Sequence, residues 1–259
     1  MLRSIKQIYG NKLGASDGEI GHVKDFYFDD QNWAIRYLVV DTGDWLVGRQ
    51  VLLSPYSLGN LDAAGKILRI NLTRKQIEDS PPIETHKPVS RQYEEEYYRH
   101  YGWPYYWQGD ALWGMSGFPL LESASKPLPR ESVMVSGPKA TTVEAHLRSA
   151  HTVTGYQLQA QDGTIGHVCD FMVDAASWAI GELVIKTGNR FSGEEILIPT
   201  KNVERISYEE STVFVNLTKE FIGQTSLPHP AATDVADLPA GNQTDASKKT
   251  EQATILRTL

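Results

Sequence analysis

Residues 17–43 read DGEIGHVKDFYFDDQNWAIRYLVVDTG, and residues 162–188 read DGTIGHVCDFMVDAASWAIGELVIKTG. The two stretches are 145 positions apart, and 16 of their 27 positions are identical without a gap. The same register holds over residues 4–77, where 26 of 74 positions are identical. Two copies are too few for a solenoid, whose repeats share one continuous core. The chain is therefore a duplicated module, and each copy is predicted to fold as a closed unit of about 75 residues.

The strongest strand signal is the second half of the repeated stretch. Residues 34–40 are rich in β-branched and aromatic side chains. A polar turn at 29–32 separates them from residues 23–28, whose alternation predicts that Val23 and Phe26 lie on opposite faces. Further strands are predicted at residues 51–53 and 67–72, and in the second copy at 196–198 and 213–217.

A short helix is predicted to follow the strands of each copy. Thr73 is suited to cap it, and Gln76 three residues later completes a capping box. Several short strands with regular turns are typical of a small barrel, whose closure removes exposed strand edges. The predicted fold class is mostly β, with two small barrels in tandem, each with a short trailing helix, joined by an aromatic-rich linker.

The repeated residues resemble the PRC-barrel family, named after the cytoplasmic barrel of the photosynthetic reaction-centre H subunit. The motif DGxIGxVxDxxxD occupies residues 17–29 and again 162–174. The resemblance covers about 150 of 259 residues. It implies a β-barrel with a trailing helix and a role as an interaction or assembly module. It implies no catalytic residues, because the family has no shared active site. The transmembrane helix of the H subunit has no counterpart in this sequence.

Four segments are predicted along the chain. The first copy spans residues 1–80, a proline- and aromatic-rich linker 81–146, the second copy 147–227, and a polar, disordered tail 228–259. The linker should contain one helix over residues 91–101, capped by Ser90 and closed by Gly102. Tyr93, Tyr97 and Tyr101 should share one face of it, with Glu94, Glu95 and Arg99 nearer solvent.

Aromatic residues are concentrated in this linker. Nine of the 21 residues from Tyr93 to Trp113 are Tyr or Trp. The candidate interaction residues are Tyr97, Tyr101, Trp103 and Trp107. They form a ligand platform, a belt at a membrane interface, a partner hot spot, or the hydrophobic cover of the two barrels.

Trp33 and Trp178 are further candidate interaction residues, because each opens the central strand in the shared triplet WAI. Either they plug the end of a barrel, or they make contact where the two barrels meet. An insertion-free duplication lets both copies make the same contacts, so we expect the barrels to pair within the chain about a pseudo-twofold axis.

Two histidines, His22 and His167, occupy equivalent positions and are a candidate polar site, although duplication alone explains the pairing. His167 and Cys169 are spaced as two ligands on one strand face, but the first copy has Lys24 at the second position. The sequence has no CxxC or HExxH motif, so neither a metal nor a cofactor is predicted. Asp25, Asp29 and their equivalents Asp170 and Asp174 are expected to accept backbone hydrogen bonds.

Composition narrows the partner class. The formal net charge is −7 and the pI is about 5.5, which argues against nucleic acid as the main partner. A single cysteine fits a reducing compartment. The N-terminus lacks a signal-peptide core and no apolar run is long enough to cross a bilayer, so a cytoplasmic protein without a membrane span is expected.

The function predicted from the sequence is that of a non-enzymatic binding or scaffolding module that mediates protein–protein assembly. Its partner is an unidentified protein, peripheral contact with a membrane is left open, and no oligomeric state is predicted. The alternative is a component of a membrane-associated or photosynthetic electron-transfer complex, which the resemblance to the reaction-centre H subunit implies.

Overall fold

The computed structural model describes residues 2–46, 49–61, 67–83, 89–120, 147–188 and 194–225. All of them belong to one compact unit, Met1–His229. The predicted tail at 228–259 and the linker residues 121–146 lie outside the described residues.

The first copy forms one sheet with the strand order β5-β4-β3-β2-β7-β6. Neighbouring strands are antiparallel, except that β2 and β7 are parallel. The strands are β2 (Lys12–Ala15), β3 (Gly18–Asp29), β4 (Ala34–Asp41), β5 (Gln50–Leu53), β6 (Leu58–Leu61) and β7 (Ile67–Ile70).

The second copy repeats this topology, with the strand order β12-β11-β10-β9-β14-β13 and a parallel β9–β14 pair. The prediction of two equivalent units is therefore confirmed. The strands are β9 (Gln157–Ala160), β10 (Gly163–Asp174), β11 (Ile180–Thr187), β12 (Glu195–Pro199), β13 (Val203–Ser207) and β14 (Thr212–Val215).

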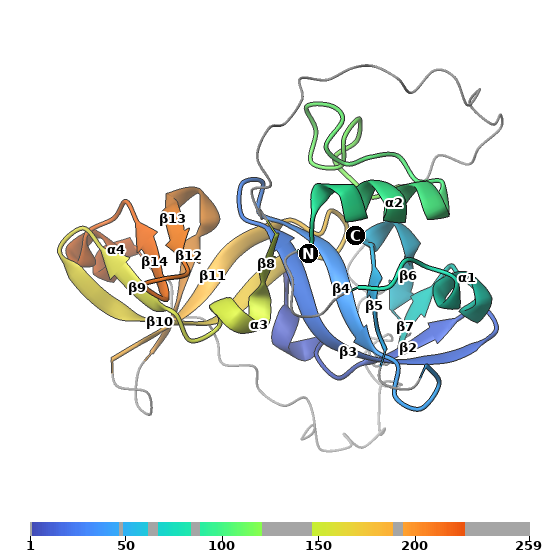
Figure 1. Ribbon diagram of the computed structural model, residues 1–259. Helices are drawn as coiled ribbons and strands as arrows, with labels where there is room; N and C mark the ends of the chain where they lie inside the picture. The colour runs from blue at the N-terminus through green and yellow to red at the C-terminus, as the bar shows by residue number, and fades with distance from the viewer. Residues whose placement is uncertain are drawn as a thin grey trace, which may run out of the picture. The chain divides into compact units, whose positions relative to one another are not determined.

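Each sheet gains a seventh strand from the other copy. The strand β1 (Leu2–Ser4), at the start of the first copy, pairs with β10 of the second. The strand β8 (Leu147–Ser149), at the start of the second copy, pairs with β3 of the first, and the two run side by side in Figure 1. The exchange is reciprocal because Leu2 lies opposite Asp174 and Leu147 lies opposite the equivalent Asp29.

The helices are short apart from the linker helix. They are the 3₁₀ turns η1 (Ile5–Gln7), η2 (Pro55–Ser57) and η3 (Thr200–Asn202), and the α-helices α1 (Arg74–Glu78), α2 (Arg91–Tyr101), α3 (Ala150–Val153) and α4 (Lys219–Thr225). The predicted capping box at α1 is confirmed, since the Thr73 and Gln76 side chains each bond the other's backbone N–H. The linker helix also begins and ends as predicted, with a Ser90 cap and Gly102 in the left-handed region at φ 69°.

The expected closure of each sheet into a barrel is wrong. Within the described residues, β5 does not pair with β6, nor β12 with β13. In the first copy η2 lies between β5 and β6, with Pro55 at its first position and Ser54 as its cap. Pro199 and η3 hold the same place in the second copy. A turn that begins with proline redirects the chain and removes a donor that a ladder would need.

The expected alternation along β3 is also wrong, because Val23 and Phe26 are both buried. The register of β3 against β4 shifts between Val23 and Asp25, which marks a β-bulge at the exposed Lys24. The second copy has the same shift between Val168 and Asp170. A bulge inserts one residue and turns the following side chains over. The bulges thereby direct Asp25 toward β8 and Asp170 toward β1.

The central strands β4 and β11 contribute several residues to each of the two cores. Val39 and Val184 are 2% and 1% exposed, so their predicted burial is confirmed. The neighbouring Phe26 and Phe171 are fully buried against them on the long strands β3 and β10.

We predict that Val39→Asp lowers the free energy of unfolding by at least about 3 kcal/mol, because it buries a charge with no partner. Lys24→Asp on the neighbouring strand is the control, since Lys24 is exposed and should tolerate the change within about 0.5 kcal/mol. Chemical denaturation measures both values, and equal midpoints would contradict the packing described for β4.

Candidate functional site

The repeated motif is used for structure in both copies. Asp17 accepts a hydrogen bond from the backbone N–H of Arg74 at 2.7 Å, and Asp162 accepts one from Lys219 at 2.9 Å. These aspartates thus satisfy the first turns of the trailing helices α1 and α4. Gly21 is required by space, because a Cβ there would lie 2.0 Å from the carbonyl oxygen of Asp41.

Asp29 and Asp174 close the polar turn that follows each long strand. Asp29 accepts the backbone N–H groups of Gln31 and Asn32, and Asp174 accepts those of Ala176 and Ser177. Burial acts to raise the pKa of Asp29, but the hydrogen bond from Asn32 and the charge of Arg36 outweigh it, so the pKa lies below its usual value. These contacts favour the charged form of Asp29, which holds the turn.

Asp25 and Asp170 bind the exchanged strands. Asp25 accepts the hydroxyl of Ser149 at 2.6 Å and the backbone N–H of His151 at 3.0 Å. Asp170 accepts the hydroxyl of Ser4 in the same way, and the backbone N–H of Lys6 at 3.3 Å. Each carboxylate thus joins its own copy to the strand that the other copy supplies, and it caps the turn that follows that strand.

Trp33 and Trp178 lie where the two copies meet. Ile35 donates its backbone N–H to the carbonyl of Trp178 at 2.9 Å, and Ile180 donates to the carbonyl of Trp33 at 2.6 Å. Ala34 and Ala179 face each other between these bonds. We call this contact, together with the β1–β10 and β8–β3 pairs, the seam. Of the two roles considered for the tryptophans, the geometry corresponds to contact between the copies.

The seam holds both tryptophans in an unusual backbone conformation. Trp33 has φ 51° and Trp178 has φ 59°, values in the left-handed region that non-glycine residues seldom adopt. The Trp33 ring stacks on Phe28 with a centroid distance of 5.6 Å, and the Trp178 side chain is buried. Such a conformation costs on the order of 1–3 kcal/mol and persists where surrounding contacts hold it.

The linker segment from Ser90 to Trp113 packs on the first copy, and Figure 1 shows α2 lying over β4 and β5. The Tyr97 hydroxyl donates to the carbonyl of Leu52 at 2.9 Å and accepts the N–H of Ser54 at 3.1 Å. Tyr97, Tyr98, Trp103, Tyr106 and Trp113 are buried, whereas Tyr93, Tyr101, Tyr105 and Trp107 are half-buried. The segment covers this copy, so Tyr97 and Trp103 do not present a free docking surface.

Glu94 is the centre of this packing, and its predicted place nearer solvent is wrong. Its carboxylate is fully buried and accepts the hydroxyls of Tyr37 at 3.0 Å and Tyr106 at 2.7 Å. Arg91 lies 3.0 Å from its other oxygen. A buried charge is tolerated when it is paired and hydrogen-bonded, and here three partners supply that compensation. Helical spacing alone did not reveal them, because Tyr37 comes from a distant strand.

A second buried pair extends the network toward the seam. Arg36 lies 3.1 Å from Asp29 and donates to the carbonyl of Leu112 at 2.6 Å. Its guanidinium also stacks on the Tyr106 ring, 3.9 Å from the centroid. Trp113 then donates its indole N–H to the carbonyl of Ser177 in the second copy at 2.7 Å. The linker segment therefore contacts both copies.

The linker segment from Ser90 to Trp113 packs on the wall of the first copy, and the equivalent wall of the second copy differs in chemistry. The first copy presents Arg36, Tyr37, Ser54 and Tyr56 there. At the equivalent positions the second copy has Gly181, Glu182, Pro199 and Lys201, which are exposed or half-buried. The second copy therefore lacks counterparts of the tyrosines Tyr37 and Tyr56 and of the stacking Arg36.

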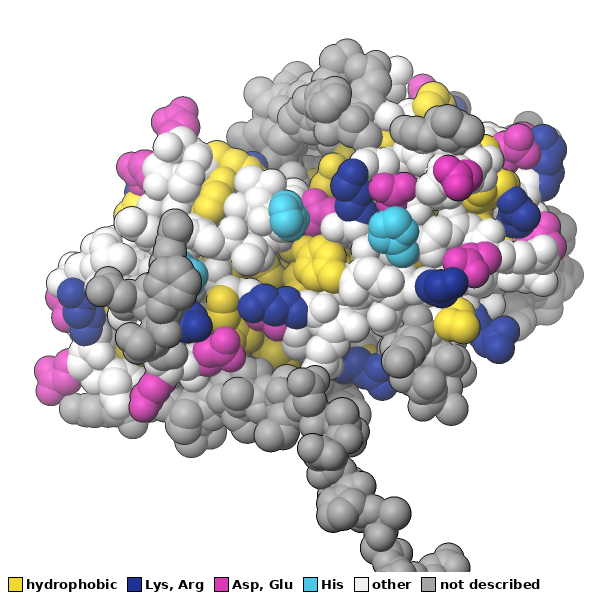
Figure 2. Space-filling model, turned by 90° about the horizontal axis from the view of Figure 1, so that it is seen from below, with side chains coloured by type: hydrophobic (Ala, Val, Ile, Leu, Met, Phe, Trp, Pro, Cys, Tyr) yellow, Lys and Arg dark blue, Asp and Glu magenta, His cyan; other side chains and the backbone are white. Residues whose placement is uncertain are grey.

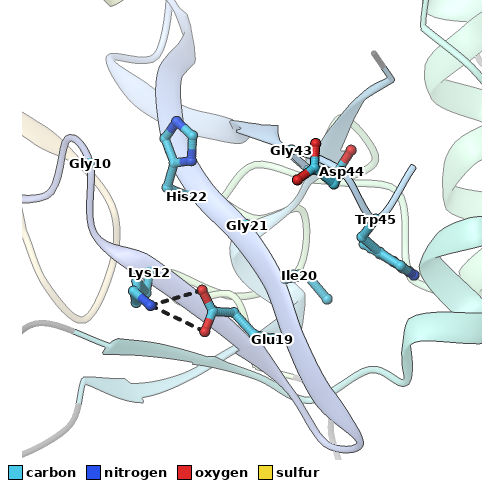
Figure 3. A pocket seen from close by; sticks show the side chains of 10 residues that line it. Gly10, Lys12, Glu19, Ile20, Gly21, His22, Gly43, Asp44 and Trp45 are labelled. Atoms are coloured by element: carbon cyan, nitrogen blue, oxygen red, sulfur yellow. Dashed lines mark hydrogen bonds and ion pairs between the residues drawn. The ribbon is translucent and has the colours of Figure 1, made fainter. Parts of the chain in front are cut away.

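The open pocket of the first copy, about 440 Å³ in volume, contains His22 (Figure 3). Its other lining side chains include the ion pair of Lys12 and Glu19 at 3.1 Å, Asp44 and Trp45. His167 and the motif aspartates at positions 25 and 29 are not among the lining residues. The structure therefore does not bring the two histidines and the aspartates into one cleft.

The remaining candidate is Cys169, which is buried on β10. Burial raises the pKa of its thiol to about 11, so the thiolate is scarce at neutral pH. Among the residues that the structure describes, no three His, Cys, Asp or Glu side chains are grouped to hold a metal ion. No helix in the described ranges is long and apolar enough to cross a membrane.

The family comparison matches both copies. The PRC-barrel domain model matches residues 5–77 and 146–222, which together exceed half of the chain. The chain belongs to the PRC-barrel family. A search of curated proteins found no match. In this PRC-barrel protein the aspartates of the repeated motif cap helices, close turns and bind the strand that the other copy supplies.

We predict that Glu94→Ala destabilises the protein by about 2–4 kcal/mol, because it leaves two buried hydroxyls and Arg91 without their acceptor. The matched control is Glu95→Ala on the exposed side of the same helix, which should change stability by less than about 0.5 kcal/mol. Equal denaturation midpoints for the two variants would contradict the buried network.

The buried tyrosines make the protein sensitive to alkali. Burial first, and then the Glu94 charge, raise the pKa of Tyr37 and Tyr106, and burial raises the pKa of Tyr97 and Tyr98. Because these pKa values exceed the unfolded value near 10, stability should fall as the pH rises above about 10. At pH 11, tyrosinate absorbance should show that fewer than 12 tyrosines are ionised in the folded protein. Addition of denaturant should raise that number to 12. Ionisation of all 12 in the folded protein would contradict the packing.

Proposed function

We propose that the protein is a non-catalytic assembly module whose two PRC barrels mediate protein–protein contact. The observation that carries the proposal is the exchange of β1 and β8, each of which adds a strand to a sheet of the other copy. Strand addition to a sheet is a general mode of protein recognition, in which backbone bonds supply affinity and neighbouring side chains supply specificity. Here the serine–aspartate bonds supply that specificity.

The non-catalytic part of the proposal rests on the use of the motif's carboxylates. Asp17, Asp25 and Asp29 each accept structural hydrogen bonds, as do their equivalents in the second copy. A motif carboxylate that acted as a general base would have to be free of such bonds and within reach of a bound substrate. The pocket that contains His22 includes none of these aspartates.

Residues 111–120, which we call the linker turn, offer a surface for an external partner. Met115 is 91% exposed, and Phe118 and Leu120 are exposed beside it. Backbone bonds from Ala111 to Gly114 and from Trp113 to Ser116 order this turn, and Trp113 anchors it on both copies. Apolar side chains exposed on an anchored turn are suited to bind a protein surface.

The charge distribution favours a protein over a polyanion as partner. Figure 2 shows Lys and Arg interspersed with Asp and Glu on one face, with hydrophobic side chains between them. This pattern and the net charge of −7 lack the basic stripe that nucleic acid requires. The proposal places the protein in the cytoplasm, where the single thiol Cys169 would stay reduced. The electron-transfer alternative stays a prediction from the resemblance alone.

The test is retention of a stoichiometric protein partner on the immobilised full-length chain. We expect Phe118→Ser combined with Met115→Ser to reduce retention at least about tenfold, by removing the apolar anchors. Phe221→Ser is the matched control, because Phe221 is 49% exposed and Phe118 is 47% exposed. Equal retention by the two variants would exclude the linker turn as the surface. A multiple-turnover activity that His22→Ala abolishes would contradict the non-catalytic role.

A further inference from the structure

The two strands exchanged across the seam are chemically the same. Both β1 and β8 read Leu-Arg-Ser, and each lies in the same register on the other copy's long strand. Ser149 bonds Asp25 as Ser4 bonds the equivalent Asp170. The strand that the first copy supplies therefore has every group needed to bind the first copy's own β3.

The rest of the seam is also made from shared residues. The reciprocal backbone bonds involve residues 33–35 and 178–180, and both triplets read Trp-Ala-Ile. Ala34 faces its own equivalent, Ala179, so it marks the pseudo-twofold axis. An isologous contact pairs a surface with an identical surface, and this seam meets that condition at each of these positions.

One ion pair shows how the seam would accept two first copies. Arg148 on β8 binds Asp30 of the first copy at 2.5 Å. On the other side Arg3 of β1 meets the second copy, which has Ala175 in place of Asp30. In a pair of two first copies, Arg3 would occupy the place of Arg148 on both sides. Both ion pairs would then form, which is as many as two first–second pairs contain, so this contact does not oppose such a pair.

We propose that the seam is a homotypic docking surface and that its partner between molecules is a second copy of this chain, whose barrel replaces the sister barrel. This rests on the proposed function as an assembly module, and it names the partner. Exchange of an identical element between molecules keeps the strand pairs and the serine–aspartate bonds of the seam, so the tether is the main factor that favours pairing within one chain. A tether acts as an effective concentration in the millimolar range, which a high protein concentration can match.

The experiment removes the tether and asks which halves pair. A protease site is placed within residues 121–146 of the full-length chain, the folded protein is cut, and the mixture is incubated near 100 µM and analysed by native mass spectrometry. We expect first–first and second–second pairs beside the original first–second pair. Only first–second pairs, or unpaired halves, would overturn the proposal.

Arg3→Glu is the discriminating variant. It leaves the Arg148–Asp30 pair of the intact seam in place, but in a first–first pair it sets a carboxylate against Asp30 on both sides. We expect it to reduce the first–first pair roughly tenfold, since two attractive contacts become repulsive. Arg99→Glu, on the exposed side of α2, is the control and should leave all three pairs unchanged.

Equal amounts of the first–first pair in the two variants would show that the halves associate elsewhere, and that result would overturn the assignment to the seam. Near-ultraviolet circular dichroism confirms that each variant is folded before it is cut. A different result is that the halves fail to exchange between molecules while the uncut chain still retains an external protein partner. That result would overturn this inference but not the proposed assembly function.

Discussion

A hydrogen bond between a serine on a three-residue strand and an aspartate beside a β-bulge holds the two copies together. The bulges at Lys24 and Cys169 aim the aspartates, and the aspartates in turn fix the exchanged strands. A three-residue strand buries too little surface to dock unaided, so the charge-assisted bond supplies both affinity and register. The left-handed tryptophans and the reciprocal backbone bonds between the copies all depend on that docking.

The two copies share most residues of the seam and differ at several positions that the linker segment contacts. Arg36 and Tyr37 in the first copy correspond to Gly181 and Glu182 in the second. The aromatic segment therefore has only one wall to cover, and its buried Glu94 meets partners only there. Among the described residues, the divergence gives the first copy a wall that binds the linker segment and the second copy a wall without these partners. The linker turn and the His22 pocket belong to the first half of the chain and the segment that follows it.

Much of the fold could be predicted, because the signals were local or repeated. The duplication, the burial of Val39 and Val184 and the caps of α1 and α2 follow from spacing and residue type. The open sheets, the bulge at Lys24 and the burial of Glu94 could not be predicted, because each depends on contacts between residues far apart in sequence. For Glu94 the partners are Tyr37 and Tyr106, and no periodicity within the helix encodes them.

The candidate site was predicted only in part, for the same reason. Repetition drew attention to Trp33, Trp178 and the motif aspartates, but it could not say whether they serve catalysis, folding or contact between the copies. The identical Leu-Arg-Ser strands ahead of both copies were the available signal for exchange. Their meaning is visible only once β8 is seen to lie on β3, more than a hundred residues earlier in the chain.

The exchange also sets an order of events during synthesis. The first copy's sheet stays incomplete until residues 147–149 have been made, some seventy residues after its own last strand. At ribosomal rates of about 5–20 residues per second, its β3 edge waits on the order of 4–14 seconds. On a polysome, the nascent chain just ahead carries the same unoccupied edge and the same short strand. The strand exchange that joins the two copies in the finished protein therefore allows a neighbouring nascent chain to compete for the unpaired part of β3. Faster synthesis of β8 favours pairing within the same chain.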